Sequence, residues 1–229
     1  MESLPLGVLP TANGMKKLLI TATIILSLGL IAYAWLSGSG TLKRIAAKHP
    51  VVVDKGRGIS KSTLEKLRAK ATLAKSFTEQ NNYNRQICFL VDMSLPSSQN
   101  RFFVYNLKKD TLQNSGLVTH GRCNENWLEG RKYGNTVGCG CTSVGKYKIG
   151  YSYNGRFGLA FKLYGLDKTN NKAFERYVVL HGHDCVPETE TNEEICQSDG
   201  CPTVAPGYLL QLKPIINASK KPILLWIFE

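Results

Sequence analysis

The feature that most constrains the fold is a series of short apolar runs from residue 86 onward. Glycine, asparagine and proline separate these runs, and residues 144–151 alternate so that Tyr147 and Ile149 share one face. Short strands with such connections are typical of β-sandwiches and β-barrels. We predict a mainly β fold of this kind, with one or two short helices. The expected strands are 87–91, 102–105, 116–119, 144–151, 159–163, 177–180 and 222–228, and a short helix is expected within 206–216.

Different segments precede the strands. Residues 37–59 open with Ser-Gly-Ser-Gly and carry several basic side chains, which is typical of a linker. Apolar residues then recur at helical spacing, so we expect a helix at 60–82 that packs on the domain. Ser62 and Glu65 have the spacing of a capping box for its start. Residues 83–229 are numerous enough to form one domain with its own core.

Residues 1–36 contain an apolar segment that indicates in which compartment the rest of the chain is located. Lys16 and Lys17 precede residues 18–36, which carry no charge. This order is typical of a secretory signal peptide or a membrane anchor. The small-x-small sequence at 32–34 fits a cleavage site, and the length also suffices to span a bilayer. Both alternatives stay open, and both put the rest of the chain outside the cytoplasm. A buried helix of a soluble protein is a third alternative.

The formal charge of the chain is +12, and residues 1–36 account for only one unit of it. A basic domain favours acidic polymers, either nucleic acid or the carboxylate-rich wall of a bacterium. The alternative is a generally basic, solvated surface. The sequence has no RNA-binding aromatic motif, zinc-finger spacing or basic heptad region. We therefore expect no nucleic acid partner.

The seven cysteines fit an oxidising compartment, where thiols pair. Because seven is odd, at least one cysteine has no partner within the chain. Cys185 and Cys196 flank the loop between His181 and Cys201, and a bridge between them would hold that loop. Three bridges would use Cys88, Cys123, Cys139, Cys141, Cys185 and Cys196. In the alternative, several of these cysteines are reduced and buried.

A histidine and a glycine-preceded cysteine near the C-terminal end are the candidate catalytic residues. A thiol needs a base to become a nucleophile near neutral pH, and histidine titrates in that range. His181 follows an apolar run, and Cys201 follows Gly200. Glycine permits a tight turn whose amides can face a developing oxyanion. The pair predicts a thiol active site, although a single His and Cys also occur in purely structural roles.

The order and spacing of these residues resemble the L,D-transpeptidases of the YkuD type. Sixteen residues separate His181 from Ser198, which begins Ser198-Asp199-Gly200-Cys201. The further likeness is to a divergent murein branch in which proline follows the cysteine. The matching elements are His120-Gly121-Arg122, Ser143-x-Gly145-x-Tyr147 and Lys162-Leu163-x-Gly165-Leu166-Asp167. The likeness covers residues 86–216 and implies the β-rich fold of that family.

The resemblance implies acyl transfer on bacterial peptidoglycan. Cys201 would be the nucleophile and His181 the base, the amides of Gly200 and Cys201 would form the oxyanion hole, and Ser198 would help hold the site. The thiolate would attack the peptide bond before the terminal D-residue of a tetrapeptide stem. An amine acceptor would then give a cross-link, and water would give L,D-carboxypeptidase activity. The chain would work as a monomer in the cell envelope without a cofactor, and residues 18–36 would hold it at the membrane if uncleaved.

Two positions depart from the family pattern. Asp199 replaces the usual second histidine, and Thr203 replaces an arginine or asparagine. Asp199 would orient a neighbour or bind a cationic group of the substrate. Arg122 or His120 would take over the contact to a substrate carboxylate.

Two alternative functions stay open at this point. In one, the same fold is a non-catalytic wall-binding module. In the other, His181, His183, Cys185, Cys196 and Cys201 bind zinc, since alternate residues of a strand share a face. The resemblance itself implies no metal.

Overall fold

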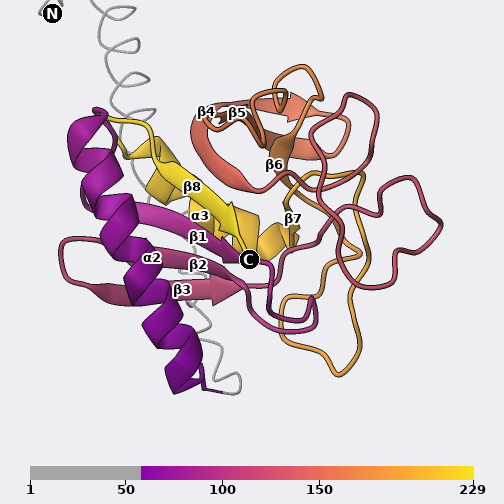
Figure 1. Ribbon diagram of the computed structural model, residues 1–229, viewed down its shortest axis with the longest axis horizontal. Coiled ribbons are helices and arrows are strands. Elements are labelled where there is room, and N and C mark those ends of the chain that lie inside the picture. The colour runs from indigo at the N-terminus through magenta and orange to yellow at the C-terminus, as the bar shows by residue number, and fades with distance from the viewer. Residues whose placement is uncertain (1–57) are drawn as a thin grey trace, which may run out of the picture. The chain divides into compact units, whose positions relative to one another are not determined.

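The computed structural model describes residues 58–229 (Figure 1). Eight strands form one mixed sheet in the order β3-β2-β1-β8-β4-β5-β6-β7. Neighbouring strands are antiparallel except in the pairs β1–β8 and β6–β7, which are parallel. The strands are β1 (Ile87–Asp92), β2 (Phe102–Asn106), β3 (Thr111–Gly116), β4 (Gly145–Gly155), β5 (Gly158–Gly165), β6 (Val179–Gly182), β7 (Thr203–Val204) and β8 (Leu224–Phe228). The helices are α2 (Lys61–Gln80) and α3 (Pro206–Asn217).

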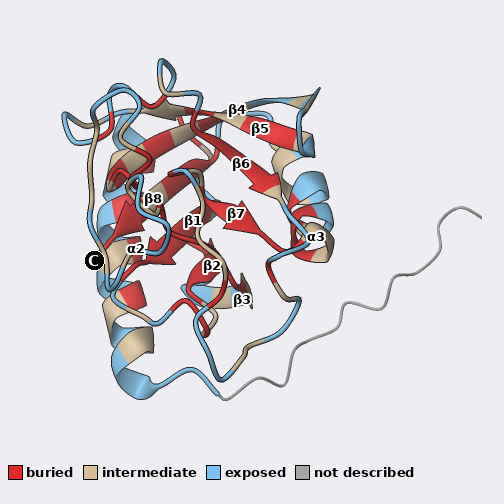
Figure 2. Ribbon diagram, turned by 90° about the vertical axis from the view of Figure 1, so that its right-hand side faces the viewer, coloured by how far each residue is buried: buried red, intermediate tan, exposed pale blue. Residues whose placement is uncertain are grey.

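The two helices pack on opposite faces of the sheet (Figure 2). The α3 side chains Tyr208, Leu209 and Leu212 belong to the larger core cluster, together with the inward side chains of β1, β4, β5 and β8. The smaller cluster joins α2 to the other face of β1, β2 and β8. Because both faces of β1 are covered, its residues 88–92 are all buried. This explains why that segment reads as a continuous apolar run rather than an alternating one.

The helix α2 begins at a different cap from the predicted one. Ser60 is the N-cap, and its Oγ accepts a hydrogen bond from the Thr63 N–H at 3.1 Å. The predicted capping box at Ser62 is therefore wrong, because Ser62 already lies inside the helix. Leu67, Ala71 and Ala74 face the sheet as their helical spacing predicts.

The C-terminal strand β8 lies in the middle of the sheet. It pairs in parallel with β1, where Leu90 is opposite Trp226, and antiparallel with β4, where Tyr147 is opposite Leu225. The last strand of the sequence therefore joins the β1–β3 half of the sheet to the half that carries β6 and β7. This second half positions the candidate site.

The mainly β fold and the helix within 206–216 are confirmed. Several predicted strands differ in their bounds from those of the structure. Residues 117–119 lie beyond β3 and make only a single bridge, from Val118 to Val204. The strand expected at 177–180 begins at Val179, because Tyr177 has a positive φ of 57° that breaks the extended backbone.

The predicted signal or anchor at 1–36, and nearly all of the linker at 37–59, lie outside the described residues. Within residues 58–229, neither helix combines the length and the apolar character that a bilayer span requires.

Candidate active site

A cavity of about 400 Å³ brings together five of the predicted site residues. Its lining includes Arg122, His181, Ser198, Asp199 and Cys201. Thr119, Phe157 and Thr203 complete the part of the wall nearest to the imidazole and the thiol. Residues that are distant in sequence meet here because the parallel pair β6–β7 places His181 beside Thr203, two positions after Cys201.

The His181 ring is held in one tautomer by its own strand. Its Nδ1 lies 3.0 Å from the Gly182 carbonyl oxygen, which only accepts, so Nδ1 carries the proton. The Nε2 atom is then unprotonated, and the Thr203 hydroxyl donates to it at 3.0 Å. Burial lowers the pKa of His181, the Gly182 carbonyl opposes this, and the neighbouring His183 lowers the pKa further. A neutral imidazole with an unprotonated ring nitrogen is what a general base requires.

Phe157 covers the same imidazole from one side. It lies in the turn between β4 and β5, and its ring stacks on His181 with centroids 4.8 Å apart and planes 15° apart. The β5 strand beside this turn pairs with β6, where Ala160 is opposite His181. The hairpin therefore positions an aromatic wall that keeps water from one face of the base.

The Cys201 thiol is free and half-buried. Its Sγ lies 3.8 Å from the Tyr177 carbonyl oxygen, to which the thiol donates. Burial raises the pKa of Cys201; a backbone hydrogen bond from Val179 and the charge of Arg176 oppose this, and Asp199 raises the pKa further. Both pKa shifts favour a neutral thiol beside a neutral imidazole. The thiolate–imidazolium pair that is one possibility for such residues is thus disfavoured in this state.

A tight turn presents Cys201 to the cavity. The Ser198 Oγ donates to the Cys201 carbonyl at 2.7 Å and accepts from the Gly200 N–H at 3.2 Å. Gly200 has a φ of 103°, and a Cβ there would lie 2.5 Å from the Cys141 carbonyl oxygen. Ser198 therefore stabilises the turn. The Gly200 amide is already bonded to Ser198, which argues against an oxyanion role for that amide in this conformation.

Arg122 and Asp199 form an ion pair at the cavity wall. The Arg122 Nε lies 2.8 Å from the Asp199 Oδ1, and both side chains are exposed. Asp199 thus holds the Arg122 side chain. The pair leaves Arg122 partly neutralised, so a substrate carboxylate would have to compete with Asp199 for it.

His120 does not reach the cavity. It is 1% exposed, and its Nδ1 lies 3.1 Å from Nη2 of the buried Arg101. Burial, together with Arg101 and Arg131, lowers the pKa of His120 to about 4. The structure therefore places His120 in a packing role behind the site, and the predicted substrate contact through it is not supported by this position.

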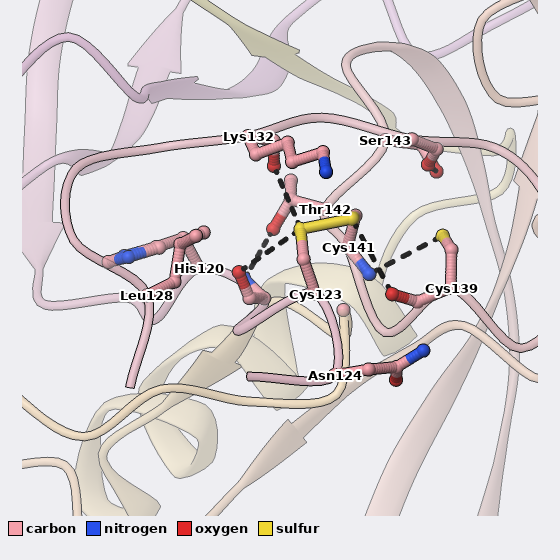
Figure 3. The surroundings of a disulfide bond; sticks show 12 residues. His120, Cys123, Asn124, Leu128, Lys132, Cys139, Cys141, Thr142 and Ser143 are labelled. Atoms are coloured by element: carbon pink, nitrogen blue, oxygen red, sulfur yellow. Dashed lines mark hydrogen bonds between the residues drawn. A yellow bond between two sulfur atoms is a disulfide. The ribbon is translucent and has the colours of Figure 1, made fainter. Parts of the chain in front are cut away.

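The bridge between Cys185 and Cys196 forms as expected, and a second one joins Cys123 to Cys141 (Figure 3). The expectation of three bridges is wrong. Cys88 is fully buried in the sheet, and Cys139 is free beside the Cys123–Cys141 bridge. That bridge lies close to the site, since the Cys141 carbonyl accepts from Arg176 Nη2 at 2.5 Å and packs on Gly200.

Several contributors to the site were not predicted from the sequence. Thr203 was noted only as a departure, although its hydroxyl contacts the base. The Gly182 carbonyl and Phe157 carry no sequence signal for their roles. Arg176 and the exposed Tyr177 follow β5 in an irregular loop, so nothing in their spacing places them beside Cys201.

The zinc alternative finds no support in this geometry. Cys185 and Cys196 are bonded to each other, which removes two of the five proposed ligands. In the described part of the chain, no group of three or more His, Cys, Asp and Glu side chains is arranged to hold a metal ion.

Comparison with known families assigns the chain to a class. The family model for the L,D-transpeptidase catalytic domain matches residues 58–228. The chain therefore belongs to the L,D-transpeptidase catalytic domain family. No curated protein gives a significant match to the chain.

Two solved structures give more distant likenesses. The helical cell shape determining protein Pgp2 from Campylobacter jejuni, as a K307A mutant, is 14% identical with a TM-score of 0.43. The match covers 69% of this chain and 56% of that one. A fused Zn-dependent amidase/peptidase/peptidoglycan-binding domain-containing protein from Clostridium acetobutylicum is 11% identical with a TM-score of 0.33, and the match covers 74% of this chain and 63% of that one. At these scores, neither structure bears on the activity of this chain.

Proposed function

We propose that this protein is a cysteine acyltransferase that acts on the stem peptides of peptidoglycan. The observation that carries the proposal is one cavity lined by a free thiol, Cys201, and by an imidazole whose Nε2 is unprotonated, His181. Membership of the L,D-transpeptidase catalytic domain family supplies the substrate class. The non-catalytic wall-binding alternative is disfavoured because both reactive groups are retained and face the same space.

The chemistry begins with proton transfer from the Cys201 thiol to His181 Nε2. The sulfur attacks the carbonyl carbon before the terminal D-residue, and the tetrahedral intermediate collapses to a thioester. The leaving amine takes the proton from the imidazolium. An acceptor amine, or water, then attacks the thioester, gives its proton to His181 Nε2, and the thiol is regenerated. General base assistance of this kind is commonly worth about 10²- to 10⁴-fold in rate.

Two hydrogen bonds must break before the first step. The thiol donates to the Tyr177 carbonyl, while His181 Nε2 accepts from Thr203. Sulfur and imidazole thus have separate partners in the free protein. Catalytic hydrogen bonds often tighten only when substrate is bound. We infer that the entering stem peptide turns the thiol away from Tyr177 and toward Nε2.

We also propose that the domain works outside the cytoplasm. The apolar residues 18–36 after Lys16 and Lys17 support export, as do the two disulfides. The basic charge of the chain suits the acidic polymers of a bacterial wall.

Mass spectrometry of the purified protein after incubation with tetrapeptide muropeptides tests the proposal. We expect an adduct on Cys201 that has lost the terminal D-residue, and its decay to a cross-linked or a trimmed stem. Cys201→Ala should abolish adduct and product while the circular dichroism spectrum stays unchanged.

The matched control is Cys139→Ala, which removes another free, partly buried thiol outside the cavity. It should leave adduct formation unchanged. Product formation by the Cys201→Ala variant at the wild-type rate would end the proposal, and so would an adduct on Cys139 alone.

A further inference from the structure

We propose that the β4–β5 ribbon carries a second binding surface, outside the catalytic cavity, for the glycan strands of the wall polymer. We call it the ribbon face. It consists of Lys148, Tyr153, Lys162, Tyr164 and Phe174. The identity of its ligand rests on the proposed function, whereas its ability to bind can be measured without turnover.

The ribbon face lies on the part of the sheet that α2 leaves uncovered. The α2 helix packs on β1, β2 and β8, and β4 and β5 continue the same face beyond it (Figure 1). The register shows this continuity, because Lys148 pairs with Leu224 of the α2-covered cluster on one side and with Tyr164 on the other. Beyond β8, α2 does not cover this face of the sheet, and the side chains of β4 and β5 form its surface.

Lysine and aromatic side chains alternate across this face. Lys148 Nζ lies 4.6 Å from the Tyr164 ring centroid, and Lys162 Nζ lies 4.6 Å from Tyr153 and 5.8 Å from Phe174. The Tyr164 and Phe174 rings stack with centroids 5.2 Å apart. A Cβ at residue 150 would lie 2.5 Å from the Tyr164 ring, so the glycine there lets the ring lie against the strand.

The charges on this face are free to meet a ligand. Lys146, the neighbouring lysine of β4, pairs with Asp167 at 2.7 Å. Within residues 58–229, neither Lys148 nor Lys162 has a carboxylate within salt-bridge distance. Phe174 is 51% exposed although it is a large aromatic residue. An exposed aromatic ring beside unpaired cations marks an interaction surface rather than a packed one.

This combination fits an acidic carbohydrate. The apolar C–H faces of sugar rings pack on aromatic rings, and the carboxylates of the stem peptides that the sugars carry would pair with Lys148 and Lys162. A short soluble stem peptide lacks the repeated sugars that such a surface needs.

The ribbon face also leads to the catalytic residues. The Tyr177 N–H donates to the Phe174 carbonyl at 3.1 Å, which closes a turn between the two residues. The Tyr177 carbonyl in turn contacts the Cys201 thiol. A glycan strand lying on Phe174 would thus pass beside the rim of the cavity and bring its own stem peptides to Cys201.

Cosedimentation with purified peptidoglycan sacculi tests this surface. The full chain is used with Cys201→Ala, so that no turnover occurs. Lys148→Gln combined with Lys162→Gln, and separately Phe174→Ala, should each weaken binding about tenfold. The matched controls remove equal charge and equal exposed apolar area elsewhere. They are Lys108→Gln with Lys109→Gln in the β2–β3 turn, and Leu73→Ala on the exposed side of α2, and neither should change binding.

Two results would overturn the surface. One is an equal loss of binding in both lysine double variants, which would show a general charge effect. The other is displacement of the protein from sacculi by a single-stranded oligonucleotide but not by glycan strands freed of peptide, which would assign the face to nucleic acid.

The same variants separate this surface from the proposed function. With Cys201 intact, they should process soluble tetrapeptide at the wild-type rate, and a loss there equal to the loss of sacculus binding would contradict a separate site. If the wild-type chain binds sacculi through the ribbon face but never forms a Cys201 adduct, the surface stands and the acyltransferase proposal fails.

Discussion

At the scale of single residues, the contact between Thr203 and His181 controls the base. The Thr203 hydroxyl donates to Nε2, while the Gly182 carbonyl holds the proton on Nδ1. The backbone of Thr203 is held as well, because its N–H donates to the Thr119 hydroxyl at 3.3 Å. The imidazole is therefore positioned from two strands and a loop before any substrate arrives.

Replacing Thr203 by valine should speed acylation with little change in KM. The substitution keeps the shape and removes a hydrogen bond to Nε2, worth about 1 kcal/mol, that must otherwise break before proton transfer, so the rate should rise by up to about fivefold. Thr203→Ser should keep the wild-type rate because it keeps the hydroxyl. Single-turnover acylation rates across pH measure the effect. A valine variant with a wild-type rate and pH profile would show that Thr203 only fills space.

At the scale of elements, the β4–β5 hairpin determines how far the His181 imidazole is shielded from water. Its turn carries Phe157, whose ring stacks on His181 and also lies edge-on to His183 at 5.6 Å. Because burial is the main cause of the lowered His181 pKa, a change in the hairpin should change the protonation of a residue on another strand.

Phe157→Ala should raise the His181 pKa toward its ordinary value of 6.5 by admitting water. The acidic limb of the profile of kcat/KM against pH reports the pKa of the base in the enzyme without substrate. With the lowered pKa, the wild-type base stays neutral to below pH 6.5, so in the variant this limb should move to higher pH. Phe157→Leu should keep more of the cover and shift less. Tyr151→Ala removes another exposed aromatic ring of the same ribbon and should leave the profile unchanged. An acidic limb that does not move in Phe157→Ala would reject the covering role.

At the scale of the whole molecule, a buried cation joins the segments that follow β1 and β3. Arg101 is fully buried, and its guanidinium donates to the Leu95 and Val118 carbonyls and to His120. The His120 carbonyl accepts from the Ser198 N–H at 2.9 Å, next to the catalytic turn. The protonation of His120 therefore matters for global stability as well as for the wall behind the site.

The free energy of unfolding should fall as the pH is lowered from 6.5 to about 4. His120 has a folded pKa of about 4 against an unfolded value of 6.5, so the unfolded chain takes up the proton first. The loss should reach roughly 2 to 3 kcal/mol by pH 4.5. Urea unfolding at pH 7.5 and pH 4.5 measures it. His120→Gln keeps an acceptor for Arg101 and should flatten this dependence; an equally steep dependence in the variant would assign the effect to other groups.

The sequence by itself determined the elements and the reactive groups. Alternation and turn residues placed most strands, helical spacing placed the helix before them, and an odd number of cysteines required a free one. The glycine before Cys201 and the loop closed by Cys185 and Cys196 were also readable, because these features are local.

Only the tertiary structure decided the strand order, the environment of the site and the protonation of its groups. The strand β8 lies between β1 and β4, where it joins the two halves of the sheet. No local sequence pattern encodes this position, because it depends on strands that are far apart in the chain. Thr203, Phe157 and Tyr177 contact the catalytic pair from other elements, and His120 is withdrawn from the cavity by a buried arginine. Burial and cross-strand contacts depend on residues far apart along the chain, so the pKa of a side chain is a property of the folded molecule rather than of its neighbours in sequence.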